Sequence, residues 1–149
     1  MTRPSEIKVR EGATPGTPYA AFEEGRQLTG VRFDITPDLI QEYIRAVDAD
    51  ASLYQLDGRA VAPPGMIFPY MTAVLYKDYP PIQGIVMGEV ELEWHAPVWA
   101  DETTPVRANG AIVRKFHKKG RGYVQWKAQF HDADGRLLWE LVNTFHVPE

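Results

Sequence analysis

The chain has 149 residues, a formal net charge of -4 and no cysteine. This length suits one domain with a substantial hydrophobic core, and the lack of cysteine excludes disulfides and cysteine-based metal sites. A mildly acidic chain without a basic stripe is a poor candidate for nucleic-acid binding. No apolar run is long enough to span a membrane and no secretion signal is recognisable, so we expect a soluble, cytoplasmic protein.

The N-terminal third predicts an arm, a strand and a helix. Residues 1–18 are rich in glycine, proline and polar side chains, which predicts a flexible N-terminal arm before a single domain at 19–149. Residues 30–35 alternate in polarity like a first strand. Thr36-Pro37-Asp38 is a typical helix start, with a capping hydroxyl and a proline in the first turn. The apolar spacing that follows predicts a helix to about Val47.

Residues 62–77 form the segment around which the rest of the chain is organised. Its apolar residues recur at spacings of three and four over most of a helical circumference, which predicts a buried helix. Pro63 and Pro64 fit the entry to this helix, because the first N–H groups of a helix have no internal partner. Gly65 then allows a close approach to the backbone, and its N–H is a candidate oxyanion donor. A buried helix with a rigid entry and no chemistry explains the same residues equally well.

The C-terminal half alternates in polarity over four long stretches, which predicts antiparallel strands separated by turns. These stretches are residues 86–95, 105–116, 123–130 and 137–147. Three glutamates, Glu89, Glu91 and Glu93, fall on one face of the first stretch and indicate a solvated surface. The fold class is therefore α+β, with a curved antiparallel sheet wrapped around one long central helix. Apolar residues on both faces of the last strand indicate contact with a second chain.

Four stretches resemble the MaoC-like hot-dog family, in particular its single-domain dehydratase and (R)-specific enoyl-CoA hydratase type. The resemblance covers about 19–147, and the stretches are residues 19–25, 46–54, 61–66 and 93–101. It implies a hot-dog fold and an acyl thioester substrate carried by coenzyme A or acyl carrier protein, as in fatty-acid or polyketide metabolism. It also implies a homodimer, or a heterodimer with another hot-dog subunit, and no cofactor beyond the coenzyme A or phosphopantetheine of the substrate.

The resemblance further implies an aspartate and a histidine that share one water and add it reversibly to an enoyl group. Here the two positions correspond to Ala49 and Tyr54, so the usual pair is altered. Asp48 and Asp50 lie on either side of Ala49, the position that corresponds to the family's aspartate. One hypothesis is a hydro-lyase in which Asp50 or Asp48 is the base, Tyr54 the acid or orienting group, and Gly65 N–H the oxyanion donor.

A second hypothesis is a non-catalytic hot-dog subunit that binds the acyl chain and supports a catalytic partner, and a third is an acyl thioesterase. Candidate substrate-binding residues are Pro64, Met66, His95, Lys118 and Arg121. Cations near one turn favour coenzyme A phosphates, although a solvated hairpin explains Lys118 and Arg121 as well. His95 equally suits a plain strand end. The four histidines show no metal-binding spacing, so we expect no metal site.

Overall fold

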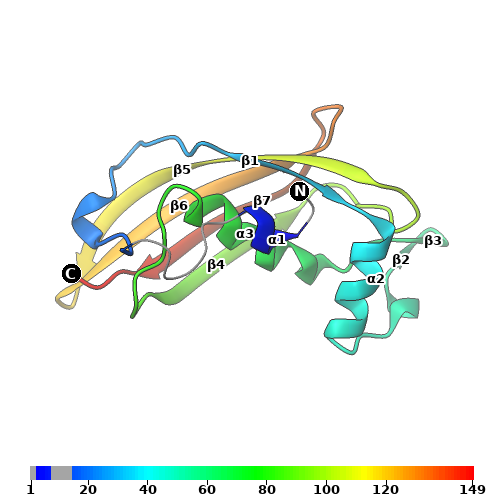
Figure 1. The fold of residues 1–149 in the computed structure, drawn as a ribbon, viewed down its shortest axis with the longest axis horizontal. Coiled ribbons are helices and arrows are strands. Elements are labelled where there is room, and N and C mark those ends of the chain that lie inside the picture. Colours follow the sequence, from blue (N-terminus) through cyan, green and yellow to red (C-terminus); the bar gives the residue numbers. More distant parts are fainter. Residues whose placement is uncertain (1–2, 8–14) are drawn as a thin grey trace.

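The computed structural model describes residues 3–7 and 15–149, which form one curved antiparallel sheet around a short helix (Figure 1). The strand order in the main sheet is β1-β5-β6-β7-β4. Its strands are β1 (Val31–Ile35), β4 (Val86–Trp94), β5 (Thr104–Lys118), β6 (Arg121–His131) and β7 (Leu137–His146). All four long strands lie where the alternation in the sequence predicted them.

Three helices, three short 3-10 turns and a two-stranded sheet complete the described structure. They are α1 (Pro4–Ile7), η1 (Tyr19–Ala21), α2 (Pro37–Ala46), η2 (Ala51–Leu53), β2 (Gln55–Leu56), β3 (Arg59–Ala60), η3 (Pro64–Met66) and α3 (Ile67–Tyr76). The start of α2 is as predicted, because Thr36 Oγ1 accepts a hydrogen bond from Leu39 N at 3.2 Å. No helix in the described ranges is long and apolar enough to span a membrane.

Helix α3 is the central helix, but it is shorter than the sequence predicted. It has 10 residues and begins at Ile67, after the 3-10 turn η3. Pro69 explains the late start, because a proline has no N–H to donate and is tolerated only within the first turn of a helix. An α-helix that began at Pro64 would place Pro69 in its interior.

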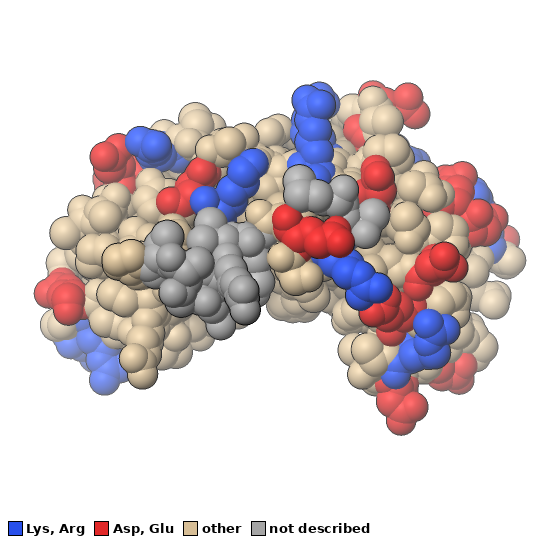
Figure 2. Space-filling view, viewed as in Figure 1, with Lys and Arg blue, Asp and Glu red and all other residues tan. Residues whose placement is uncertain are grey.

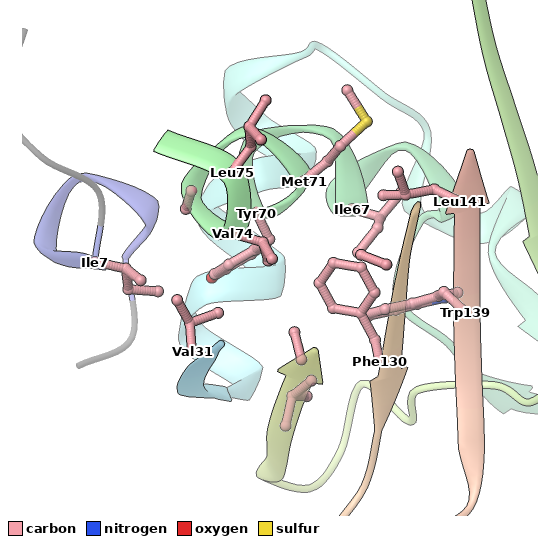
Figure 3. Packing of buried hydrophobic residues seen from close by; sticks show 14 of the residues in the cluster. Ile7, Val31, Ile67, Tyr70, Met71, Val74, Leu75, Phe130, Trp139 and Leu141 are labelled. Carbon is pink, nitrogen blue, oxygen red and sulfur yellow. The ribbon is translucent and has the colours of Figure 1, made fainter. Parts of the chain in front are cut away.

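The core forms where α3 lies against the sheet (Figure 3). The buried residues of α3 are Ile67, Tyr70, Met71, Ala73, Val74 and Leu75. Tyr70 stacks on Phe33 of β1 with ring centroids 4.1 Å apart. Phe33 in turn meets Phe130 of β6 edge-on, and Phe130 meets Trp139 of β7 in the same way. Each such aromatic pair contributes about 0.5–1.5 kcal/mol beyond the burial of its area, so this row of rings fixes α3 to three strands.

The N-terminal segment lies on the opposite side of α3 from the main strands. Ile7 is buried in the same core, and Arg3 forms an ion pair with Glu42 of α2 at 2.6 Å. Residues 1–2 and 8–14 of the predicted arm lie outside the described residues. Acidic and basic side chains are interspersed over the face of the molecule in Figure 2.

Asn143 of β7 is a buried polar residue, 3% exposed, that connects three strands. Its Oδ1 accepts a hydrogen bond from Trp126 Nε1 of β6 at 2.9 Å, and its Nδ2 donates to the backbone oxygen of Glu89 in β4 at 2.8 Å. The second contact lies at an irregularity between Met87 and Glu89, where the pairing of β4 with β7 shifts register. The amide therefore satisfies a carbonyl at the point where the edge strand departs from regular pairing.

We predict that Asn143→Ala lowers the free energy of unfolding by about 2–4 kcal/mol, because it leaves a buried indole N–H and a carbonyl without their partner. Urea denaturation followed by circular dichroism measures the change. The control is Thr144→Val, which removes the half-buried Gln125–Thr144 hydrogen bond between the same two strands. That bond lies on the outer face, so its loss is expected to cost less than about 1 kcal/mol. Equal effects of the two substitutions would contradict the role of Asn143.

Candidate functional site

A cavity of about 420 Å³ lies beside the N-terminal end of α3. Its walls come from the segment that leads into α3, from the end of β4 and from β7. The lining residues are Leu53, Tyr54, Gln55, Leu56, Val61, Ala62, Pro64, Trp94, His95, Ala96, Pro97, Val98 and Trp139. Most of them are apolar, and Trp94 and Trp139 face each other directly across β4 and β7. We call this cavity the α3 pocket.

The fold brings three of the predicted site residues to the α3 pocket: Tyr54, Pro64 and His95. Tyr54 follows η2, Pro64 begins η3 and His95 follows β4, so the three come from separate parts of the chain. A phenol and an imidazole at one apolar cavity are groups that can donate or accept a proton near a bound ligand.

Asp48 and Asp50 are exposed and do not line the α3 pocket. Asp50 caps η2, where its Oδ1 accepts hydrogen bonds from Ser52 N at 2.9 Å and from Ser52 Oγ at 2.7 Å. These bonds hold the pKa of Asp50 below its usual value. A carboxylate whose charged form is stabilised in this way is a weaker base. Asp48 lies after α2 with a φ of 51°, in the left-handed region.

Gly65 and Met66 lie at the entry to α3. Met66 is buried in the core, and its N–H donates to the oxygen of Pro63 at 3.0 Å. A Cβ added to Gly65 would lie 2.7 Å from the hydroxyl oxygen of Tyr43, which comes from α2. The lack of a side chain at Gly65 therefore lets the Tyr43 hydroxyl approach this turn closely. Burial, and then the nearby Tyr54 phenol, raise the pKa of Tyr43.

Tyr43 of α2 was not among the predicted site residues. Its hydroxyl approaches Gly65 across a contact between positions far apart in the sequence. Two apolar residues of that helix, Ile40 and Ile44, are fully or nearly fully buried, whereas Tyr43 is half-buried. A tyrosine at the boundary of a core usually directs its hydroxyl to a polar neighbour, which is the signal that could have singled it out.

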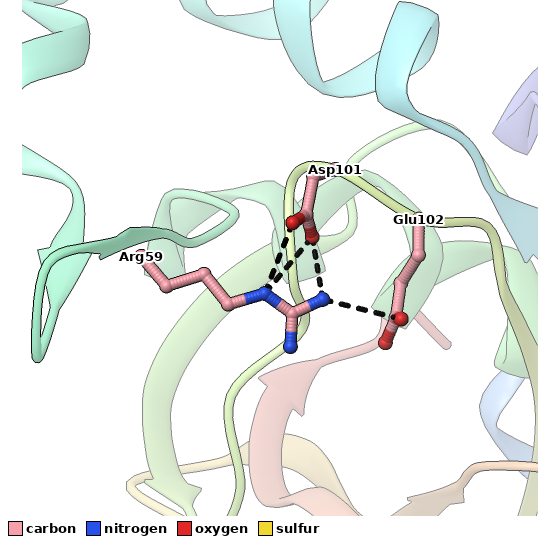
Figure 4. Close-up of polar contacts among 3 residues, drawn as sticks. All are labelled: Arg59, Asp101 and Glu102. Carbon is pink, nitrogen blue, oxygen red and sulfur yellow. Dashed lines mark hydrogen bonds and ion pairs between the residues drawn. The ribbon is translucent and has the colours of Figure 1, made fainter.

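The segment before α3 contains a β-hairpin, in which β2 and β3 pair antiparallel. Asp57 and Gly58 both have positive φ, at 51° and 77°, as a two-residue hairpin turn requires. Beyond the turn, Arg59 Nη2 donates to Asp101 at 2.6 Å and to Glu102 at 3.2 Å (Figure 4). The Arg59 guanidinium also lies 4.2 Å from the ring centroid of Trp99. The hairpin is thereby fixed to the loop between β4 and β5 at one wall of the α3 pocket.

His95 also belongs to a small cluster on the outer face of the sheet. His95 Nε2 lies 3.1 Å from Glu140 Oε1 and 4.0 Å from Glu93 Oε2. Hydrogen bonds from Gln129 and then from His95 hold the pKa of Glu140 below its usual value. The ligand atoms of these three residues lie within 4.8 Å of one another, as the donors of a metal site would. A histidine beside two carboxylates forms the same arrangement as an ordinary ion pair without a metal. The absence of a metal site therefore remains a prediction from the sequence.

Lys118 and Arg121 lie at the other end of the sheet from the α3 pocket. They border the turn between β5 and β6, whereas Trp139 is close to the opposite end of the β6–β7 ladder. Together with Lys119, Phe116 and Tyr123, they line a separate groove of about 530 Å³ that reaches β4. Within one chain, the structure therefore does not bring the two cations to Tyr54 and Pro64.

Comparisons with known proteins identify the fold. No protein-family model matches the sequence, and no curated protein matches it at a significant level. Among solved structures, the chain is similar to the HadBC (3R-hydroxyacyl-ACP dehydratase) complex from Mycobacterium tuberculosis, with a TM-score of 0.69 and 20% identity over 83% of this chain and 96% of that chain.

Two further structures share the fold. R-hydratase PhaJ1 from Pseudomonas aeruginosa matches with a TM-score of 0.68 and 16% identity over 90% of this chain and 87% of that chain. A MaoC-like dehydratase from Rhodospirillum rubrum matches with a TM-score of 0.70 and 16% identity over 90% of this chain and 98% of that chain. The chain thus has the hot-dog fold of these dehydratases and hydratases, as the resemblance in the sequence predicted.

We predict that Gly65→Ala lowers the free energy of unfolding by about 1–3 kcal/mol, because the added methyl group collides with the Tyr43 hydroxyl. In a Tyr43→Phe background the same substitution should cost much less, since the colliding oxygen is absent. Urea denaturation of the wild type, both single variants and the double variant closes a double-mutant cycle. If Gly65→Ala cost the same in both backgrounds, Tyr43 would not be the residue that requires glycine.

We predict that Arg59→Ala loosens the hairpin without unfolding the domain, because an exposed ion pair contributes little to global stability. Amide hydrogen exchange should quicken at Val61, Ala62 and Ala100, whose N–H groups bond to Tyr54, Val98 and Ala60. The control is Arg136→Ala, which removes an ion pair away from the hairpin, that with Asp132, whose side chain is 12% exposed. Unchanged exchange at these three amides in Arg59→Ala would contradict the role of Arg59.

Proposed function

We propose that this chain is the acyl-chain-binding subunit of a dehydratase or hydratase that acts on an acyl thioester. In this proposal the α3 pocket binds the acyl group, and a second hot-dog subunit paired with this one supplies the acid–base residues. The thioester is carried by coenzyme A or by acyl carrier protein, so the chain needs no further cofactor.

The observation that carries the proposal is the composition of the α3 pocket. Its walls are mostly apolar, and its volume of about 420 Å³ lies within the range of about 300–1,000 Å³ found for small-molecule sites. Yet no carboxylate is among its lining residues, since Asp50 is bonded to Ser52 and Asp48 is exposed. Addition of water to an enoyl group needs a base and an acid at one site, and the chain offers the cavity without that usual pair.

The exposed edge of the sheet supports a paired subunit. Strand β4 is bonded to β7 on one side only. Val86, Met87 and Trp94 on this strand are 58%, 49% and 44% exposed, which leaves apolar surface uncovered. The HadBC neighbour is a complex, so pairing of unlike subunits occurs in this fold.

The remaining predicted site residues take supporting roles in the proposal. Pro63 and Pro64 have no backbone N–H. The N–H groups of Met66 and Ile67 donate to carbonyl oxygens within the turn. In this proposal the N–H of Gly65 is therefore the donor for a thioester oxygen. Pro64 lies in the pocket wall, and the buried Met66 supports that wall from the core. Lys118 and Arg121 would meet the phosphates of a carrier bound across two subunits.

A second candidate is an enzyme that uses His95. The specific observation is the His95–Glu140 contact of 3.1 Å at the edge of the α3 pocket, since a carboxylate that orients a histidine is a common arrangement for acid–base catalysis. Tyr54, which lines the same cavity, would be its proton donor or orienting group. In that case the isolated chain would hydrate enoyl thioesters, and Asp50→Asn would have no effect if His95 is the base.

We predict that the purified chain binds octanoyl-CoA but does not hydrate crotonyl-CoA or longer enoyl-CoA on its own. Isothermal titration calorimetry measures the binding, and loss of enoyl-thioester absorbance measures the reaction. Leu53→Asp combined with Leu56→Asp places charge on the exposed apolar wall of the pocket, and should weaken octanoyl-CoA binding by about tenfold or more.

The control for this experiment is Val113→Asp, at an apolar position that is 41% exposed and does not line the α3 pocket. It should bind octanoyl-CoA like the wild type. Absence of binding by the wild type would refute the proposal. Turnover by the chain alone would instead favour the second candidate, which loss of activity in His95→Gln and Glu140→Gln would then establish.

A further inference from the structure

Strand β4 is the longest unpaired edge of the main sheet in the described structure. It has 9 residues against 5 in β1, the strand at the other edge. One side of β4 presents backbone N–H and C=O groups that no strand satisfies. Trp94 and Met87 leave apolar surface beside this edge. An edge with these features is competent to extend the sheet with a strand from another chain.

The face of β4 that points away from α3 carries a row of three glutamates. Glu89, Glu91 and Glu93 lie opposite Thr144, Val142 and Glu140 of β7. Those β7 residues alternate with the buried Leu141 and Asn143, so they point to the outer face of the sheet. Residues opposite each other in a ladder share a face, and the three glutamates therefore point outward too. The side chains of Glu89 and Glu91 form no hydrogen bond or ion pair within the described residues. We call Glu89, Glu91 and Glu93 the acidic row.

The acidic row opposes pairing of β4 with a second copy of itself. When two copies of β4 pair antiparallel across a two-fold axis, two residues that face each other must lie on the same face of the sheet. Between Glu89 and Trp94, such residues have numbers that are both odd or both even. If the axis passes through Val90, Glu89 faces Glu91 of the other copy. If it passes through Glu91, that residue faces its own copy and Glu89 faces Glu93. Like charges directly opposite each other destabilise a strand pair.

We propose that β4 pairs with the edge strand of a different hot-dog subunit, one that carries lysine or arginine on its outer face opposite the acidic row. This inference rests on the proposed function, which calls for a second subunit, and it adds the chemistry by which that subunit is recognised. Opposite charges across an interface favour the correct partner and disfavour self-association. Pairing would also cover Met87 and Trp94, which are exposed and lie opposite the buried Phe145 and Trp139 on the inner face.

The test uses a copy of this chain with a basic edge as the probe. Glu89→Lys combined with Glu91→Lys removes no side-chain hydrogen bond or ion pair within the described residues and reverses two charges of the row. Analytical ultracentrifugation of the wild type, the variant and a 1:1 mixture gives the dissociation constants. The mixed dimer should be at least about tenfold tighter than either dimer of identical chains. The single variant Glu91→Lys gives a second reading, in the same direction, if the double variant does not fold.

Salt dependence separates charge recognition from a general effect of substitution. Raising the salt concentration from about 0.1 M to about 1 M shortens the Debye length from about 10 Å to about 3 Å. The mixed dimer should weaken over this range, whereas self-association of the wild type should strengthen. The matched control combines Asp57→Lys with Asp134→Lys, which changes the net charge equally in two exposed turns outside the edge. This variant should not pair with the wild type.

Two outcomes would overturn the proposal. A wild-type dimer as tight as the mixed one would show that the acidic row does not select the partner. No association in the mixture would show that β4 is not a pairing edge. Octanoyl-CoA binding to the α3 pocket is measured on the single chain, so the proposed function can survive or fail independently of either outcome.

Discussion

The fold depends on the need to cover a helix that is apolar around most of its circumference. Six of the residues of α3 are buried, and they do not lie on a single stripe. A sheet can cover only one side of such a helix. The curvature of the long strands extends that cover, and β1, α1 and α2 close the remaining sides. Each additional Å² of apolar surface removed from water contributes about 25 cal/mol, so cover on all sides is strongly favoured.

The α3 pocket lies at the N-terminal end of α3, where the elements that cover this helix end. At the entry to α3 the prolines replace a regular helical turn by a 3-10 turn, and the chain before them crosses the surface as a hairpin. The hairpin has little core of its own, and its position depends on the exposed contacts of Arg59 with Asp101 and Trp99. Local stability is lowest in segments held by few buried contacts. The cavity is therefore bounded by the sheet on one side and, on the other, by a hairpin that has no buried residue of its own.

The strands and the start of α2 could be predicted from the sequence because their signals are local. Alternation of polar and apolar residues indicates a strand with one solvent-exposed face, and Thr36-Pro37 indicates the start of a helix. Both signals are independent of residues far away in the sequence. The late start of α3 is also local, since it follows from Pro69. The site could be predicted only in part. Tyr54, Pro64 and His95 line one pocket, and their roles in it stay a prediction. Arg59 and Asp101 are 42 positions apart and carry no local signal of their contact.

Strand β4 has to satisfy different requirements on its two faces. Its inner face completes the core next to β7, where the Asn143 amide bonds to the carbonyl of Glu89 at the register shift. That bond fixes which residues of β4 point outward, because the side-chain period of a strand is two. The same contact that anchors the strand therefore sets the acidic row in place on the outer face. An uncharged edge with this much exposed apolar surface would pair with any strand, itself included. Charge on the outer face restricts the choice of partner without altering the core.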